Sequence, residues 1–239
     1  GPNDFKVCDQ VDAPYYEKNV YLGWAFLSYI NLYVMMPLFN FFDDYFDNYG
    51  IVILIMVFIV KTVLFPLTYR SYRSMAKMRV LKPQMDEIKG KYPDDMQRQQ
   101  QETMKLYQQV GVNPISGCIP ILAQIPVFIA LFNFFPNAIQ LRQAEFLWAE
   151  DLSTYDSIME LSFSIPFYGD HVSLFTLLMT GSTLLYTYFN NQMGAGAATQ
   201  GPMKSIGYIT PLIFIFVLNN FAAGLTYYYF VSNLITIGQ

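Results

Sequence analysis

Charged residues are scarce in this sequence. They make up 13% of its 239 residues, about half of the share that soluble domains carry. Apolar residues make up 54%, and aromatic residues alone make up 18%. So few charges cannot cover a soluble surface, and we expect much of this surface to face lipid. The composition therefore predicts a membrane protein.

Cysteine and histidine are almost absent, with two cysteines and one histidine in the whole sequence. Cys8 lies in a polar N-terminal stretch and Cys118 begins an apolar run, so we read them as two free thiols rather than a disulfide. Neither cysteine suggests a metal site, and the one histidine, His171, lies at the outer edge of the third predicted span. The sequence has no glycine-rich phosphate-binding loop either. We therefore expect no metal and no cofactor.

Apolar runs long enough to cross a bilayer recur along the chain. A spanning helix needs about 20 predominantly apolar residues, and the tract 205–237 is long enough for two. This tract breaks at "NNFAAG", residues 219–224, because asparagine and glycine favour turns. We predict an all-α polytopic protein with five membrane spans, at about residues 51–69, 114–135, 172–190, 205–220 and 222–238.

A further apolar stretch, "LGWAFLSYINLYVMMPLFNFF" at residues 22–42, contains several polar residues and ends in an acidic cluster. We interpret residues 22–48 as an amphipathic helix that lies in the membrane interface. A sixth span is the alternative. Residues 1–21 form a polar segment before it. The opening Gly1-Pro2 resembles the remnant of a protease site, so we expect that residues upstream have been removed.

Basic residues are distributed unevenly between the loops. Residues 70–113 contain nine of the fourteen lysines and arginines, whereas residues 136–171 contain only Arg142, together with six acids. Loops rich in lysine and arginine stay on the cytoplasmic side. We therefore predict that residues 70–113 and the C-terminus are cytoplasmic. The loop 136–171 and the N-terminal segment are then extracytoplasmic.

Residues 70–113 have the pattern of a helical hairpin. A stop at residues 90–93 and a candidate N-cap at Asp94 separate two helices. Their apolar positions make a thin stripe of Met75, Met78, Met85 and Ile88 against Met96, Thr103, Tyr107 and Val110. This leaves two readings open, a solvated loop and a docking platform. The candidate contact residues for a cytoplasmic partner or lipid headgroups are Lys77, Arg79, Lys82, Lys89 and Lys91.

One lysine, Lys61, lies near the middle of the first predicted span, and no Asp or Glu lies in any of the five. A cation at that depth costs about 2.5–3.5 kcal/mol on insertion scales, so it needs a polar surrounding. Snorkelling is the alternative, but Lys61 is about 13 Å along the helix from Arg70. Polar residues on other spans could surround it: Gln124, Ser182, Thr183, Thr187, Thr226, Tyr228, Tyr229, Ser232 and Asn233.

Three function classes can be compared on these residues. An ion-coupled transporter normally uses carboxylates within the membrane, and the predicted spans contain none. An intramembrane hydrolase needs a serine paired with its base, and no Ser-His or Ser-Lys motif is present. The remaining class is a protein whose unpaired cation attracts a negatively charged guest from outside the chain.

Several motifs closely resemble the YidC family of bacterial membrane protein insertases. They are "YGIVILIMVFIVKTVLFPLT", "SMAKMRVLKPQMDEIKGKYP", "QQVGVNPISGCIPILAQIPVFIALF", "QLRQAEFLWAEDLS" and "AAGLTYYYFVSNLITIGQ". The resemblance covers about residue 22 to the end. It implies five membrane helices around a hydrophilic groove open to the cytoplasm, an interfacial helix on the outer face, and a cytoplasmic hairpin. It also implies that the protein inserts membrane proteins, with no enzyme activity.

The resemblance implies which residues line the groove. The family's groove arginine is matched here by Lys61, which keeps the charge but loses the two-pronged guanidinium. The substrate-contacting positions carry over to Gln124, Pro126, Phe128, Tyr228 and Tyr229, and Ser232 lies beside them. The implied partners are nascent membrane proteins and the bilayer of the inner membrane, with the ribosome and the Sec translocon as further candidates. The large extracytoplasmic β-domain and the basic tail of some members are absent from this sequence.

Overall fold

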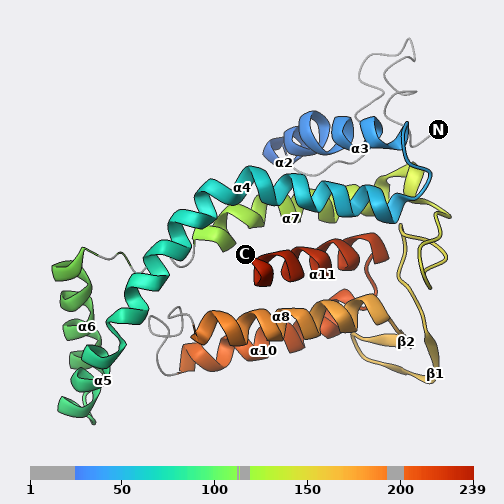
Figure 1. Cartoon of the computed structure of the whole chain (residues 1–239). Coiled ribbons are helices and arrows are strands. Elements are labelled where there is room, and N and C mark those ends of the chain that lie inside the picture. Colours follow the sequence, from blue (N-terminus) through green and yellow to red (C-terminus); the bar gives the residue numbers. More distant parts are fainter. Residues whose placement is uncertain (1–24, 112, 114–118, 193–201) are drawn as a thin grey trace.

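The computed structural model describes residues 25–111, 113, 119–192 and 202–239 (Figure 1). Five helices run side by side along one axis: α4 (Tyr49–Val80), α7 (Ile119–Asn137), α8 (Leu174–Gln192), α10 (Pro202–Leu218) and α11 (Ala223–Gly238). Helices α5 (Lys82–Lys91) and α6 (Met96–Val110) project from one end of this bundle. Strands β1 (Met159–Ile165) and β2 (Gly169–Val172) lie at the other end.

Each of the five predicted apolar runs overlaps one of these helices. Among the described residues, α4 alone is long and apolar enough to cross a membrane by length and composition, and shorter apolar helices cover Leu122–Asn137 and Gly207–Leu218. The count of five spans therefore stays a prediction. Residues 1–21, both cysteines and the first residues of the second predicted span lie outside the described residues.

Helix α4 is longer than the predicted span. The Asn48 side chain caps it by accepting hydrogen bonds from the backbone N–H groups of Gly50 and Ile51, at 3.0 and 3.3 Å. The predicted span ends at residue 69, but the helix continues to Val80. Residues 70–80 contain good helix formers and no breaker. Pro66 lies inside the helix and cannot donate a backbone hydrogen bond there.

The hairpin packs around a small core of its own. Met75, Met78, Leu81, Met85 and Tyr107 are buried together, and the Tyr107 hydroxyl donates to the Met85 sulfur at 3.0 Å. The predicted apolar stripe was therefore right for Met75, Met78, Met85, Thr103 and Tyr107, which are buried. It was wrong at its ends, because Met96 and Val110 are exposed.

The N-cap of α6 differs from the prediction by one residue. Asp95 rather than Asp94 begins the helix, since its carboxylate accepts from the Arg98 N–H at 2.9 Å. Gly111 ends it in the left-handed conformation with a φ of 68°.

Residues 25–43 form one continuous helical segment beside the bundle. It comprises α2 (Ala25–Ile30), a π-helical turn η2 (Asn31–Met35) and α3 (Met36–Asp43). Pro37 follows the π turn, and its missing N–H fits a locally widened helix. The Asn31 side chain donates to the Ala130 carbonyl in the middle of α7 at 2.8 Å. The segment thus packs along the side of α7, and its place in the membrane interface stays a prediction.

The loop 136–171 contains more structure than the all-α prediction allowed. It holds a short 3-10 helix η4 (Ile139–Leu141) and the antiparallel hairpin of β1 and β2, in which Glu160 pairs with His171. Val172, which was assigned to the third span, belongs to β2, and α8 begins two residues later. The buried Asp156 carboxylate accepts from the Leu174 and Phe175 N–H groups, at 2.9 and 3.1 Å, and so caps α8.

Apolar side chains fill the end of the bundle nearest the β-hairpin. This apolar core includes Val57, Leu131, Phe134, Phe135, Leu225 and Tyr228. The loop 136–171 closes over it, because the Leu152 carbonyl accepts from the Gly224 N–H at 2.9 Å and covers the start of α11. A Cβ on Gly224 would lie 2.8 Å from the Phe135 ring, so only glycine fits this contact.

Candidate functional site: a buried lysine between three helices

Lys61 lies inside the bundle and is 7% exposed. Its ammonium donates to the Gln124 side-chain oxygen on α7 at 3.1 Å and to the Thr236 hydroxyl on α11 at 2.8 Å. An ammonium has three N–H donors, so these two bonds satisfy most of its hydrogen-bonding capacity. Both acceptors are neutral, and the positive charge therefore remains uncompensated.

The acceptors of Lys61 are themselves joined through Ser232. The Gln124 amide donates to the Ser232 hydroxyl at 2.9 Å, and the Thr236 hydroxyl donates to the Ser232 carbonyl at 2.7 Å. Ser232 and Thr236 are one helical turn apart and lie on the same face of α11. We call Lys61, Gln124, Ser232 and Thr236 the Lys61 cluster. It links α4, α7 and α11 by side-chain hydrogen bonds.

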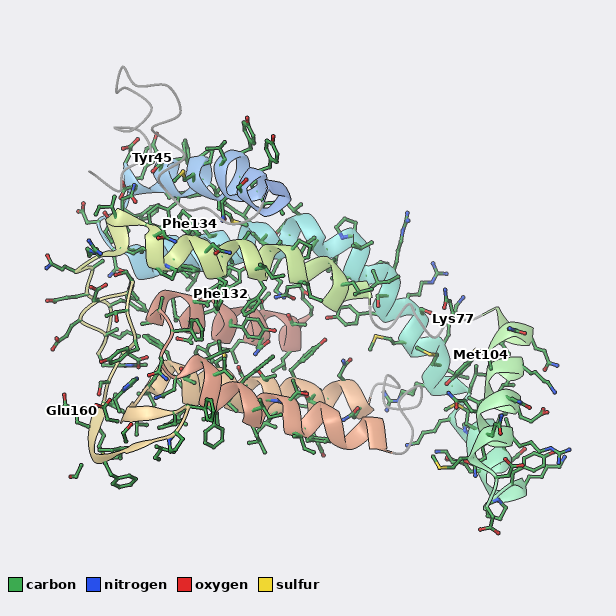
Figure 2. All side chains as sticks on the ribbon, turned by 180° about the vertical axis from the view of Figure 1, so that it is seen from behind. Tyr45, Lys77, Met104, Phe132, Phe134 and Glu160 are labelled. Carbon is green, nitrogen blue, oxygen red and sulfur yellow. The ribbon has the colours of Figure 1, made fainter. Side chains whose placement is uncertain are left out.

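The Lys61 cluster lies toward the end of the bundle from which α5 and α6 project. Gln124 follows the start of α7 by five residues, and Thr236 precedes the end of α11 by two. Both of these helix ends face the α5 and α6 side (Figure 1). Figure 2 labels Phe132 and Phe134 on the part of α7 farther from Lys77 and Met104. Between α4, α7 and α11, the polar Lys61 cluster thus lies nearer the hairpin end, and mainly apolar side chains pack toward the other end.

No carboxylate neutralises Lys61 within the part of the chain that the structure describes. The ion pairs found there are Lys89–Asp86, Lys105–Glu102 and the contact of His171 with Asp170. The first two belong to the helical hairpin and the third to β2. Nor do the described residues bring together three His, Cys, Asp or Glu side chains that could hold a metal ion.

Two of the predicted aromatic residues lie against one another beside the cluster. The Phe128 ring packs edge-on against the Tyr229 ring with centroids 5.1 Å apart, and both are partly buried. Pro126 lies on the same helix as Gln124 and is also partly buried. Tyr228 instead belongs to the apolar core, where it is 1% exposed and packs near Phe135.

The other predicted polar residues do not reach Lys61. The Asn233 amide donates to the Ser182 and Thr183 hydroxyls, at 3.0 and 2.8 Å, and so links α11 to α8. Thr187 and Thr226 donate to carbonyls of their own helices. Such bonds are ordinary for hydroxyls in membrane helices.

Sequence reasoning missed Thr236 as a partner of Lys61. One signal could have found it, since Thr236 follows Ser232 by four residues and so lies on the same helical face.

The basic residues predicted as a cytoplasmic contact region are all exposed. Lys77 and Arg79 lie in the last turn of α4, and Lys89 and Lys91 lie in the last turn of α5. Lys82 is the first residue of α5. Cations at helix C-termini interact favourably with the helix dipole, so these residues also have a local structural role.

The arrangement defines a helical membrane protein with a polar, positively charged centre between its helices. A model of the family described as 60Kd inner membrane protein matches residues 41–239, and the chain belongs to this family. It is therefore an inner-membrane protein.

The relatives of the chain carry the name membrane protein insertase YidC. The chain is 56% identical to that of Amoebophilus asiaticus and 55% identical to that of Cytophaga hutchinsonii. The matches cover 100% of this chain but 39% and 38% of these two relatives, so the chain spans about two fifths of their length. A solved structure titled "Active YidC insertase crystal structure with the first transmembrane domain resolved" superposes with a TM-score of 0.67 and 26% identity. That match covers 100% of this chain and 53% of the other.

Proposed function

We propose that the protein is an insertase and chaperone for nascent membrane proteins, and that the Lys61 cluster is where it receives them. The observation that carries this proposal is a buried ammonium held by the neutral acceptors Gln124 and Thr236. The names of the relatives and of the similar solved structure support the same function. No cofactor and no covalent chemistry are required.

The guest that suits Lys61 is an acidic, extracytoplasmic segment of a nascent chain. Neutral acceptors satisfy the N–H groups of Lys61 but do not balance its charge, whereas a carboxylate does both. In a site of low dielectric constant that difference is large. An acidic side chain that approaches from the hairpin end therefore displaces Gln124 or Thr236 from the ammonium. The polar segment crosses part of the membrane within a hydrophilic groove lined by this cluster.

The hydrophobic segment of the guest then leaves into lipid between α4 and α11. Burial of its apolar surface contributes about 25 cal/mol per Å², which drives the release. The membrane potential assists an acidic segment that moves outward by about 2.3 kcal/mol per charge per 100 mV. The aromatic pair Phe128 and Tyr229 lies beside the cluster and contacts the guest on its way.

The finer features of the proposal concern orientation and partners. The five helices α4, α7, α8, α10 and α11 span the membrane, with the α5 and α6 end in the cytoplasm and the β1 and β2 end outside. The segment 25–43 is the interfacial helix of the outer face. The exposed basic residues of the helical hairpin meet the ribosome, the Sec translocon or lipid headgroups during delivery.

Insertion efficiency with paired substrates tests the proposal. Cells depleted of their own insertase would express this protein with Lys61→Arg, Lys61→Ala or Lys61→Glu, together with a single-span substrate whose translocated segment is acidic or neutral. We expect Lys61→Arg to retain activity and Lys61→Ala to insert the acidic substrate less efficiently. Lys61→Glu should insert it least efficiently, because a negative charge repels the guest. The neutral substrate is the matched control. Equal insertion of the acidic substrate by Lys61→Glu and wild type would refute the role of Lys61.

A further inference from the structure

Apolar and polar residues alternate in the sequence of the first strand of the β-hairpin. Strand β1 has Met159, Leu161, Phe163 and Ile165 at every second position, and its pairing with β2 shifts register between Glu160 and Ile165. These apolar side chains are not all buried against the protein, since Met159 is 54% exposed and Phe163 is 64% exposed. Apolar side chains in a row on an exposed strand normally have a partner surface.

The turn of the hairpin exposes a further phenylalanine. Phe167 is 88% exposed and has a φ of 69°, a conformation that bulky residues rarely adopt. A strained backbone that presents a bare phenyl ring to water has no benefit for folding. The same ring has a clear benefit if a surface outside the chain covers it.

The protein holds this turn firmly against the end of α10. The Asn219 amide donates to the Tyr168 carbonyl at 2.9 Å, and the Asn220 amide donates to the same carbonyl at 3.0 Å. The Tyr168 ring packs edge-on against Phe216 of α10 with centroids 5.9 Å apart. Gly169 has a φ of 105° and leaves no room for a Cβ beside Asn220. The turn therefore stays at a fixed height along α10.

The apolar surface continues from the hairpin onto α10. Phe216, which contacts the turn, is itself 47% exposed. The chain belongs to an inner-membrane family, so an exposed apolar face of a bundle helix faces lipid. Figure 1 shows the hairpin beside the same end of α10. The exposed apolar residues of α10 are Ile209, Leu212, Ile213, Phe214, Phe216 and Val217.

We propose that the β-hairpin is a membrane-inserting element, which buries Phe163 and Phe167 in the acyl-chain boundary of the leaflet next to the end of α10. Apolar burial alone holds it there, because residues 157–172 contain no lysine or arginine that could bind anionic headgroups. The exposed polar residues Ser162 and Ser164 remain in water. This inference does not depend on the insertase function.

Spin labels report the depth of these residues. Cysteine would replace Phe163, Phe167, Ser162 or Ser164 in a background of Cys8→Ser and Cys118→Ser, and each labelled protein would be placed in lipid nanodiscs. We expect the ratio of oxygen to nickel-complex accessibility to be several-fold higher at positions 163 and 167 than at 162 and 164. The ratio should not change between zwitterionic and anionic lipid. Equal ratios at all four positions, or insertion that requires anionic lipid, would overturn the proposal.

A second measurement uses the unaltered chain. A phospholipid that carries a photoreactive group near the top of its acyl chain should label residues 158–168 after illumination, and mass spectrometry locates the label. In the spin-label experiment, labels at 163 and 167 that are immobilised and shielded from both oxygen and nickel would mean that a protein surface, such as a second copy, covers these residues. That result, or the absence of lipid labelling on the hairpin, contradicts insertion into the leaflet.

Discussion

Lys61 shows how a single residue can be well hydrogen-bonded and still attract a guest. Gln124 and Thr236 remove the cost of unpaired N–H groups, which lets the lysine sit inside the bundle. They leave its charge without a counter-ion, and in the proposed function that charge attracts the carboxylate of an incoming guest. Stability at rest and attraction of a guest thus depend on two different properties of the same ammonium group.

Thr236 gives a direct test of this division. Thr236→Val has nearly the same shape but removes one acceptor from Lys61, so we expect the free energy of unfolding to fall by about 1–3 kcal/mol. Thr236→Ser keeps the hydroxyl and should restore most of it. Thr187→Val is the matched control, because Thr187 donates only to a carbonyl of its own helix. Thermal unfolding in detergent measures all three, and equal losses for Thr236→Val and Thr187→Val would contradict the role of Thr236.

Some of the Lys61 cluster could be predicted from sequence and some could not. Lys61 is identifiable because a charge in an apolar run needs polar neighbours. Gln124 and Ser232 follow as polar residues on other predicted spans. Which of the many candidates contact Lys61 depends on how three helices are rotated about their own axes. Sequence periodicity does not predict this rotation for helices that are apolar almost all round. Asn233 illustrates the limit, since it turns toward α8 instead.

Among the elements, α11 depends on a close approach to α7. A Cβ on Gly224 would lie 2.8 Å from the Phe135 ring and 3.1 Å from the Leu152 carbonyl oxygen. We expect Gly224→Ala to reduce the free energy of unfolding by about 1–3 kcal/mol through overpacking. Gly181→Ala on α8 is the control, because a Cβ there meets nothing within 4 Å. The two melting temperatures in detergent should differ. A Gly224→Ala protein as stable as the control would show that Phe135 and the loop at Leu152 move aside at no cost in stability.

The helical hairpin is the element expected to act in delivery of the substrate. Removal of residues 82–109 takes away α5 and most of α6 but leaves the Lys61 cluster in place. We expect the shortened protein to remain folded, because Met85 and Tyr107 pack against the last turns of α4, outside the apolar core of the bundle. Its insertion of a short single-span substrate should fall several-fold in cells. Full insertion by the shortened protein would remove the hairpin from the delivery step.

The elements differ in how well their sequences predict them. Apart from the end of α4, long apolar runs locate the ends of the bundle helices to within about five residues, although Pro126 and Pro211 lie inside α7 and α10. The β-hairpin was missed because the loop 136–171 was judged by its charge. The alternation of Met159, Leu161, Phe163 and Ile165 with polar residues was the signal for a strand. The true length of α4 was missed because a helix can leave the membrane without ending.

On the scale of the whole molecule, the two ends of the bundle differ in chemistry. The α5 and α6 end carries exposed basic residues, and the other end carries the acidic loop 136–171 and the β-hairpin (Figure 2, where Glu160 and Lys77 are labelled far apart). Helix starts at the acidic end are covered by Asp156 and by carbonyls of the loop. An uneven molecule of this kind has a strong preference for one orientation in the membrane.

Labelling with a membrane-impermeant maleimide tests this orientation. In a background without Cys8 and Cys118, we expect Glu160→Cys to react in spheroplasts, because the proposed topology places the acidic end outside. Arg98→Cys on α6 should react only after the cells are permeabilised. Both positions are exposed, so neither depends on opening of the fold. The opposite pattern of labelling would reverse the proposed topology.

Helix α4 has a mechanical consequence for the whole molecule. It is a single helix of 32 residues that includes Lys61 and continues to Val80 at the hairpin, with Pro66 between them. A helix bends most easily where a proline removes a backbone hydrogen bond. Val80 is about 21 Å along the axis from Pro66, so a bend of about 5° there moves the hairpin by about 2 Å. A force on α5 and α6 thus bends α4 in the turn next to Lys61, because the same helix reaches both ends of the molecule.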